Sequence, residues 1–408
     1  MMRPSMTQKK ETAINLNVFQ NINLNYLYAG LMRLRLDWAV WMLFLGQRDI
    51  GLFEIGLIQS ISQFASMASD APAGAISDIL GRKTSAVLSI VIRVIGFAII
   101  LVAHDVMLFA LGYALVAVSQ EFFNATYESI AYDSLKITKN ATNFKKVLGN
   151  LFAVMFIASS LGVAASGFVA ERSFEAVYIV SLIIALFALI PVFFFAETTK
   201  ILNPERRQKS IARHFSNTLQ VIKHNPIVMY MLALGVGIFV VDNTIYSFLQ
   251  KYFTDMAVPL YLLGLIFSID QFCVAAGAKL SSLLDRFNIK NVIIAIPVLM
   301  LLSYALLALS NNVASAIFLF FVAFAVSMFY PIQSEIVNSR IPAESRATVL
   351  SVKNQLSSLG IMIVFPMVGF MAEKVSLSFA LLCLVVAALP VLLYPAIRLR
   401  QMDLGKRR

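Results

Sequence analysis

Several carboxyl groups stand inside long apolar stretches of this chain, where an unpaired charge is costly. Asp242 and Asp270 have no basic residue at a similar depth in the neighbouring stretches, and Tyr246 follows Asp242 after one helical turn. At the centre of a bilayer a charge costs at least about 2.5–3.5 kcal/mol unless it finds a partner or water. A lone carboxyl in such surroundings can exchange protons near neutral pH. The two aspartates are therefore candidates for proton coupling or, alternatively, for a hydrogen-bonded contact between helices.

A second group of polar residues combines both signs of charge. Arg33 and Asp37 are four residues apart, so they would share one face of a helix and could pair. Glu121, Asn124 and Glu128 follow one helical face in a later stretch. Arg33 and Glu121 lie at similar depth and could pair across two helices. Substrate binding, proton coupling and structural pairing remain open for this group.

Asp70 and Arg93 lie at similar depths in adjacent stretches, and we expect them to form a structural pair within the membrane.

The sequence contains no pattern that indicates an enzyme. The histidines, at positions 104, 214 and 224, fall in loops, and the motifs His-Glu-x-x-His and Gly-x-Ser-x-Gly are absent. We therefore expect no catalytic residue, no metal and no cofactor, and we do not expect an enzyme.

The composition indicates which elements hold these residues. Of the 408 residues, 59% are hydrophobic and 13% are charged, and the mean hydropathy is +0.80. Soluble domains carry about a quarter of charged residues. Apolar runs near the ~20 residues of a membrane-spanning helix recur throughout. The sequence predicts an all-α integral membrane protein with twelve spans, at residues 23–46, 51–77, 84–103, 106–133, 144–170, 174–196, 226–250, 258–282, 291–310, 313–337, 346–371 and 376–397.

Lys and Arg are distributed unevenly between two sets of loops. With both termini on one side, the loops of the other side carry only Arg48, Arg172, Lys251 and Lys374. Positively charged loops stay in the cytoplasm, so both termini are predicted to be cytoplasmic. The same distribution accounts for the net charge of +11 without nucleic acid. The predicted parts are a cytoplasmic N-terminal segment (1–22), a six-helix half (23–196), a cytoplasmic loop (197–225), a second six-helix half (226–397) and a basic cytoplasmic tail (398–408).

Residues 56–64 reappear almost unchanged at residues 264–272. The copies differ at two positions, and one difference places Asp270 where the first copy has Ser62. A membrane protein built from two similar halves is typically a transporter, because the substrate site lies where the repeats meet. Since the carboxyl of Asp270 breaks the repeat, it is the first candidate for coupling.

The stretch after the second predicted span resembles a known signature. Gly74-Ala-Ile-Ser-Asp78-Ile-Leu-Gly81-Arg82-Lys83 is similar to the Gly-x-x-x-Asp-x-x-Gly-Arg-Lys pattern in loop 2–3 of the major facilitator superfamily. Gly81 allows a tight turn, and Asp78 can pair with Arg82. The resemblance implies two pseudo-symmetric six-helix halves. It also implies a cytoplasmic gate made of Gly74, Asp78, Gly81, Arg82, Lys83 and Asp133.

Two further motifs resemble one bacterial branch of that family, whose members are labelled drug or small-molecule transporters. Asp70-Ala-Pro72-Ala-Gly74 is similar to its Glu-x-Pro-x-Gly, and Glu128-Ser-Ile-Ala-Tyr132-Asp133-Ser-Leu135 to its Glu-Ala-x-x-Tyr-Asp-Ser-Leu. The resemblance favours proton-coupled export of lipophilic or cationic small molecules by alternating access. The arginine in mid span four and the Gly-Pro in span five that drug–proton antiporters often carry are absent. A proton symporter that imports a sugar or organic anion is therefore the alternative.

The expected partners follow from these arguments. They are the lipid bilayer, a small-molecule substrate and protons as the coupling ion, with no nucleic acid. We expect a functional monomer in the cell membrane, the cytoplasmic membrane of a bacterium.

Overall fold

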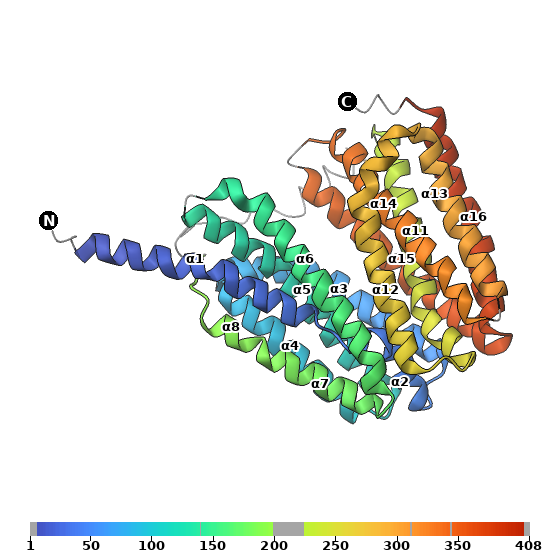
Figure 1. Cartoon of the computed structure of the whole chain (residues 1–408), viewed down its shortest axis with the longest axis horizontal. Coiled ribbons are helices and arrows are strands. Elements are labelled where there is room, and N and C mark those ends of the chain that lie inside the picture. Colours follow the sequence, from blue (N-terminus) through green and yellow to red (C-terminus); the bar gives the residue numbers. More distant parts are fainter. Residues whose placement is uncertain (1–5, 139, 199–223, 311, 343–344, 404–408) are drawn as a thin grey trace. The chain divides into compact units, whose positions relative to one another are not determined.

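The structure is a computed structural model (Figure 1). It describes residues 6–138, 140–198, 224–310, 312–342 and 345–403. Every regular element among these residues is helical. The loop predicted over 197–225 lies almost entirely outside the described residues. The chain forms two compact units, residues 1–38 with 61–207 and residues 39–60 with 208–408.

The first unit is a helical bundle with an apolar core. Its α4 packs along α5, and α1 packs against α5 and α6. Tyr28 and Phe123 are fully buried at the centre of this core. The helices are α1 (Met6–Arg33), most of α3 (Leu52–Leu80), α4 (Arg82–Val102), α5 (Val106–Ile137), α6 (Phe144–Ala170), α7 (Phe174–Phe187) and α8 (Leu189–Phe193), with the 3-10 turn η2 (Ala141–Asn143) before α6.

The turn between α3 and α4 depends on Gly81. Its φ angle is +101°, a conformation that residues with a Cβ rarely adopt, and it occupies the N-cap position of α4. This confirms the predicted tight turn. The turn brings Asp78, near the end of α3, close to Arg82, the first residue of α4.

The second unit is also a helical bundle, in which α11 packs against α14, α15 and α16 (Figure 1). Helix α12 packs against α14, and α13 packs against both α14 and α16. The elements are α2 (Trp41–Gln47), the first turns of α3, α11 (Pro226–Asp255), α12 (Leu260–Leu280), η3 (Ser281–Arg286), α13 (Ile289–Leu309), η4 (Val313–Ser315), α14 (Ala316–Asn338), α15 (Arg346–Lys374) and α16 (Leu377–Gln401).

Residues 39–60 pack within the second unit, although the sequence analysis placed them in the first half. The main-chain N–H of Met42 donates to the side chain of Gln250 at 3.2 Å. Gly56 on α3 allows close packing, because a Cβ there would lie 2.5 Å from the Cα of Pro366 on α15. The compact units therefore do not coincide with a simple division of the chain into two halves.

Ten of the described helical segments are long and apolar enough to cross a membrane. The first predicted span is not one of them, because α1 ends at Arg33 and the chain continues as η1 (Asp37–Ala39) and α2. Helix α3 has 29 residues but includes Glu54, Asp70 and Asp78. The all-helical, multi-span architecture is confirmed, whereas the first predicted span is not one continuous helix.

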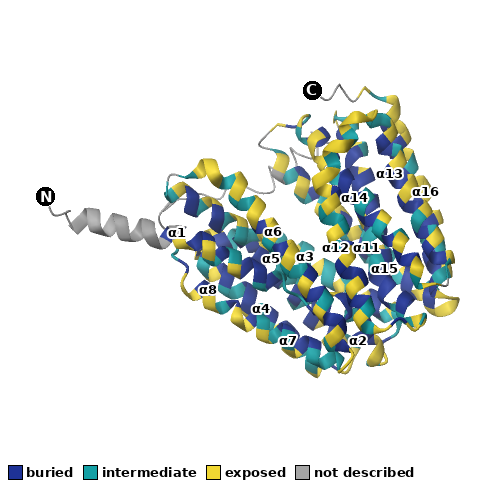
Figure 2. Ribbon diagram, viewed as in Figure 1, coloured by how far each residue is buried: buried dark blue, intermediate teal, exposed yellow. Residues whose placement is uncertain are grey.

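Burial within each unit follows the pattern of a membrane protein. Buried side chains face neighbouring helices, and large apolar side chains such as Phe64, Phe194 and Phe321 are exposed on the surfaces of the bundles (Figure 2). Extensive exposed apolar surface is unfavourable in water. In a bilayer these side chains contact lipid tails, while the helices satisfy their own backbone groups.

Candidate functional site

The second unit contains two buried carboxyl groups, Asp242 and Asp270, that form no ion pair with a described cation. Asp270 on α12 is 2% exposed, and its Oδ1 has no hydrogen-bond partner among the described residues. Asp242 on α11 accepts a hydrogen bond of 2.6 Å from the hydroxyl of Tyr304 on α13. Neither aspartate forms an ion pair with a described Lys or Arg.

Aromatic and amide groups lie beside these carboxyls. Asp242 is close enough to Asp270 for the two to interact electrostatically. The ring of Tyr246 packs edge-on against Phe267, with 4.9 Å between the ring centres. The hydroxyl of Tyr246 accepts a hydrogen bond of 3.5 Å from the side-chain amide of Gln271, the residue after Asp270. Tyr246 therefore lies at the same contact between α11 and α12 as the acidic pair.

Two further polar atoms next to Asp242 have no partner. Oδ1 of Asn243 and Oγ1 of Thr244 are buried without a hydrogen bond among the described residues. Buried polar atoms in folded proteins are almost always paired, so each exception needs an explanation. Like Oδ1 of Asp270, each of these atoms would accept a hydrogen bond from water or a ligand, and the successive residues of α11 face different directions.

The first unit also buries a charge, but it provides acceptors for it. The guanidinium of Arg93 on α4 donates to the carbonyl oxygen of Met32 at 2.6 Å, to Oγ of Ser119 at 3.1 Å and to Oε1 of Gln120 at 3.0 Å. Asp70 is not among the partners of Arg93, which corrects the predicted pair. The prediction required an opposite charge, whereas neutral oxygen atoms on α1 and α5 satisfy this guanidinium.

A chain of hydrogen bonds links this arginine to a carboxylate on α5. Gln120, which accepts from Arg93, donates to Oδ1 of Asn124 at 3.0 Å. Asn124 in turn donates to Oε2 of Glu121 at 3.3 Å, and the hydroxyl of Ser66 donates to Oε1 of Glu121 at 2.6 Å. The side-chain amides of Gln120 and Asn124 therefore connect the cation of Arg93 to the carboxylate of Glu121 through hydrogen bonds.

The pairing of Arg33 with Asp37 is also corrected by the structure. Asp37 is 1% exposed and forms its ion pair with Arg35. Helix α1 ends at Arg33, so residues 33 and 37 no longer share a helical face. The guanidinium of Arg33 instead lies 5.7 Å from the ring centre of Phe123, and it is close enough to Glu121 for electrostatic interaction.

The residues of the loop signature form an ion cluster within the first unit. Arg82 pairs with Asp78 at 2.7 Å and with Asp133 at 3.2 Å, and it donates to the hydroxyl of Ser77 at 2.9 Å. Asp133, at the end of α5, therefore joins the signature as the resemblance implied. Gly74 lies one turn before Asp78 on α3. The role of this cluster as a gate stays a prediction.

Sequence reasoning missed the part played by Glu197. Its carboxylate accepts hydrogen bonds from the main-chain N–H of Arg82 at 3.0 Å and of Lys83 at 3.1 Å, at the N-terminus of α4. A negative charge is favourable at this end of a helix. The contact joins residues far apart in the chain, so no local pattern could reveal it.

Glu128, a predicted candidate for substrate binding or coupling, is exposed on α5.

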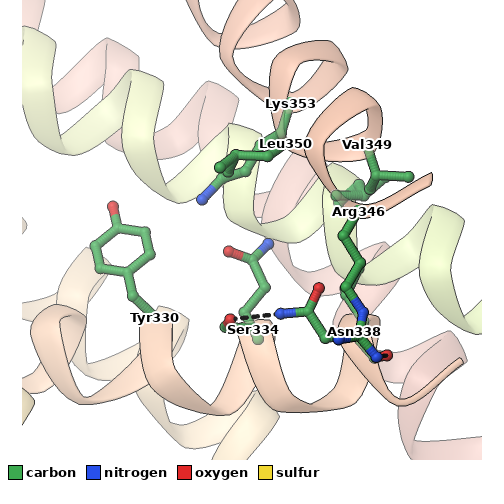
Figure 3. Close-up of a pocket in the computed structure, with 10 residues that line it drawn as sticks. Tyr330, Ser334, Asn338, Arg346, Val349, Leu350 and Lys353 are labelled. Carbon is green, nitrogen blue, oxygen red and sulfur yellow. Dashed lines mark hydrogen bonds between the residues drawn. The ribbon is translucent and has the colours of Figure 1, made fainter. Parts of the chain in front are cut away.

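Sequence reasoning also missed a cavity of about 460 Å³ within the second unit (Figure 3). It lies between α11, α14 and α15, and Tyr330, Asn338, Arg346 and Lys353 are among its lining residues.

Sequence reasoning also missed Tyr304, whose hydroxyl donates to Asp242. The one signal for Tyr304 was a polar hydroxyl in the middle of the span predicted at 291–310.

Comparisons with known proteins agree on one family. The sequence model of the Major Facilitator Superfamily matches residues 24–365. A relative from Bacillus subtilis (strain 168), the uncharacterized MFS-type transporter YxaM, is 18% identical over 362 residues. The matched region covers 87% of this chain and 90% of the relative.

Solved structures of transporters share the fold. The nucleoside transporter NupG has a TM-score of 0.69 at 16% identity, with 96% of this chain and 100% of that chain covered. A D-xylose-proton symporter has a TM-score of 0.71 at 13% identity, covering 91% and 97%. A bacterial homolog of the human lysosomal transporter Spinster has a TM-score of 0.67 at 16% identity, covering 96% of each chain. At these identities the likeness concerns the fold alone.

Proposed function

Because the chain belongs to the Major Facilitator Superfamily, it is a secondary transporter, and we propose that it uses protons to drive the export of lipophilic or cationic small molecules. The observation that carries the proposal is the carboxyl of Asp270, which is buried on α12 with an unpartnered Oδ1. The direction of transport and the kind of substrate rest on the sequence motifs that resemble a branch of drug transporters.

Proton coupling follows from the cost of a buried charge. The carboxyl of Asp270 is buried and no described cation pairs with it, so its ionised form is costly, and a proton bound to the carboxyl removes that cost. Asp242 interacts with it electrostatically, so ionisation of one carboxyl disfavours ionisation of the other. The hydroxyl of Tyr304 donates to Asp242 and so stabilises one negative charge. The pair can thus hold one proton when shielded and release it when exposed to water.

The same surroundings suit a positively charged, partly apolar substrate. The rings of Tyr246 and Phe267 provide aromatic surface beside Asp270, and a cation is attracted both to carboxylates and to aromatic faces. A cationic substrate and a proton would then compete for one negative charge. Mutually exclusive binding of this kind couples the movement of the two in opposite directions.

A proton symporter that imports a small organic anion is the second candidate. Its supporting observation is the cavity of the second unit, where Arg346 and Lys353 are among the lining residues. These cations suit a carboxylate or phosphate on a metabolite. The two candidates predict opposite directions of substrate movement across the same proton gradient.

The experiment uses the full-length protein in proteoliposomes with a fluorescent lipophilic cation as the probe. An imposed proton gradient should drive uphill movement of the probe, and a protonophore should abolish it. Asp270→Asn should reduce this flux to the level of empty liposomes. Asp255→Asn is the matched control, because Asp255 lies at the exposed end of α11 and pairs with Lys251.

Two outcomes would contradict the proposal. Probe flux that persists unchanged after the gradient collapses would exclude proton coupling. Wild-type flux and a wild-type pH profile in Asp270→Asn would remove Asp270 from the mechanism. Uphill uptake of an organic anion together with protons, without movement of the cationic probe, would favour the symporter instead.

A further inference from the structure

The cavity between α11, α14 and α15 is positively charged, as far as its described lining residues show. Arg346 and Lys353 line it from α15, and none of its described lining residues is acidic. Tyr330 and Asn338 line it from α14 (Figure 3). Its volume, about 460 Å³, falls within the range of about 300–1,000 Å³ that is usual for small-molecule sites.

No described acidic residue of the second unit pairs with Lys353. The residue is half-buried, and its ammonium lies 4.9 Å from the ring centre of Tyr330. It forms no ion pair with any residue that the structure describes. A half-buried ammonium that rests on an aromatic ring keeps most of its donors for another acceptor.

Arg346 has donors to spare on the same cavity. One guanidinium nitrogen donates to the main-chain carbonyl of Asn338 at 3.0 Å, which fixes the side chain beside α14. Guanidinium carries five N–H donors in a planar fork. The side-chain amide of Asn338 donates to the hydroxyl of Ser334 at 3.0 Å, and its oxygen does not add a negative charge to the cavity (Figure 3).

Snorkelling is the simplest alternative for Lys353, since a long side chain near the end of a span reaches toward water. Lys374, at the opposite end of α15, provides the comparison within the same helix. Its ammonium also lies over an aromatic ring, 5.8 Å from the centre of Phe370. Unlike Lys353, it is not among the residues that line this cavity. The two lysines therefore separate an effect of the cavity from the general effect of a terminal lysine.

We infer that this cavity binds a phosphate group, held between the ammonium of Lys353 and the guanidinium of Arg346. Two cations match the charge of a phosphate, and the guanidinium fork suits its oxygen atoms. The group could belong to the headgroup of an anionic lipid or to a soluble phosphorylated molecule. The inference does not rest on proton coupling or on export, because binding can be measured without transport.

The test measures binding of phenyl phosphate to the full-length protein in nanodiscs of phosphatidylcholine, with sodium chloride at matched ionic strength as the reference. Thermal unfolding should shift upward with phenyl phosphate concentration and not with chloride. Lys353→Met and Arg346→Gln should each weaken binding by about tenfold, as expected for loss of a charge-assisted hydrogen bond. Lys353→Arg should restore binding, and Lys374→Met should bind like the wild type.

A second arm distinguishes the two sources of phosphate. If the lipid headgroup occupies the cavity, nanodiscs that contain phosphatidylglycerol should prevent the binding of phenyl phosphate. Native mass spectrometry should then find bound phosphatidylglycerol in the wild type but not in Lys353→Met. Unchanged phenyl phosphate binding in these nanodiscs assigns the cavity to a soluble ligand. The inference is overturned if Lys353→Met binds both probes as tightly as the wild type, or if chloride reproduces the effect of phenyl phosphate.

Discussion

The two copies of the repeated segment, residues 56–64 and 264–272, differ in the hydrogen bonding of one equivalent position, Ser62 in the first and Asp270 in the second. In the first copy, Ser62 on α3 donates a hydrogen bond of 3.3 Å to the carbonyl oxygen of Tyr113 on α5. In the second copy, Asp270 on α12 is buried, and its Oδ1 has no partner in the described part of the chain. The same helical position is thus used for packing in one copy, while the other leaves a titratable group available for chemistry.

The contrast extends to the other buried charges of the two units. In the first unit, Arg93 has three oxygen acceptors and Asp37 has the guanidinium of Arg35. In the second unit, Asp242 has a neutral tyrosine hydroxyl, and Lys353 has an aromatic ring. Satisfied polar groups hold a structure rigid, whereas unsatisfied ones are free to bind. Arg93 and Asp37 of the first unit are therefore held by structural contacts, whereas Asp270 and Lys353 of the second unit can still take up a proton or a ligand.

The largest expected difference between the units concerns stability. Arg93→Met should destabilise the protein by about 3 kcal/mol, because it removes three hydrogen bonds to Met32, Ser119 and Gln120 from the interior of the first unit. Asp270→Asn should change stability by less than about 1 kcal/mol, because Oδ1 has no hydrogen bond to lose and the carboxyl has no ion pair among the described residues. Equilibrium unfolding of both variants in mixed micelles checks the comparison. If Arg93→Met is as stable as the wild type, Arg93 is not a structural charge. If Asp270→Asn is unfolded, Asp270 has a structural role.

A smaller effect is expected for the ion pair of Arg35 with Asp37. A double-mutant cycle with Arg35→Gln and Asp37→Asn should give a coupling energy of about 1–3 kcal/mol, since the carboxyl is 1% exposed. The double variant should be more stable than either single variant, because no unpaired charge remains buried. Additive effects of the two substitutions would show that the pair does not stabilise the first unit.

Most helices could be predicted from the sequence, because each has to fill a bilayer with apolar residues. The span predicted at 144–170 matches α6, and the one at 313–337 differs from α14 by a few residues. The break after Arg33 was missed for a physical reason. Hydropathy averages over a window, and the apolar residues on either side outweigh the short stretch from Leu34 to Trp38, which contains Arg35 and Asp37 and leaves the helix.

The candidate site could be predicted only as far as single residues. Asp242 and Asp270 stand out because a carboxyl inside an apolar run is unusual in any context. Their neighbours depend on how each helix is rotated about its axis, so the sequence places the hydroxyl of Tyr304 inside a span but does not show that it bonds to Asp242. The partners of Arg93 were missed because hydroxyl, amide and carbonyl oxygens are too common to identify an acceptor in advance.

The smallest effect on stability is expected in the ion cluster of the loop signature, where structure and function should separate. Asp78 is 42% exposed at its side chain, so Asp78→Asn should cost less than about 1 kcal/mol of stability. Asp133 is 15% exposed and also pairs with Arg82, so Asp133→Asn should cost somewhat more. A gate should change the transport rate of both variants far more than their unfolding, because its contacts form in only one state of the cycle. If transport instead falls only in proportion to the folded fraction, Arg82 belongs with Arg93 among the structural charges of the first unit, and the contrast between the two units becomes sharper.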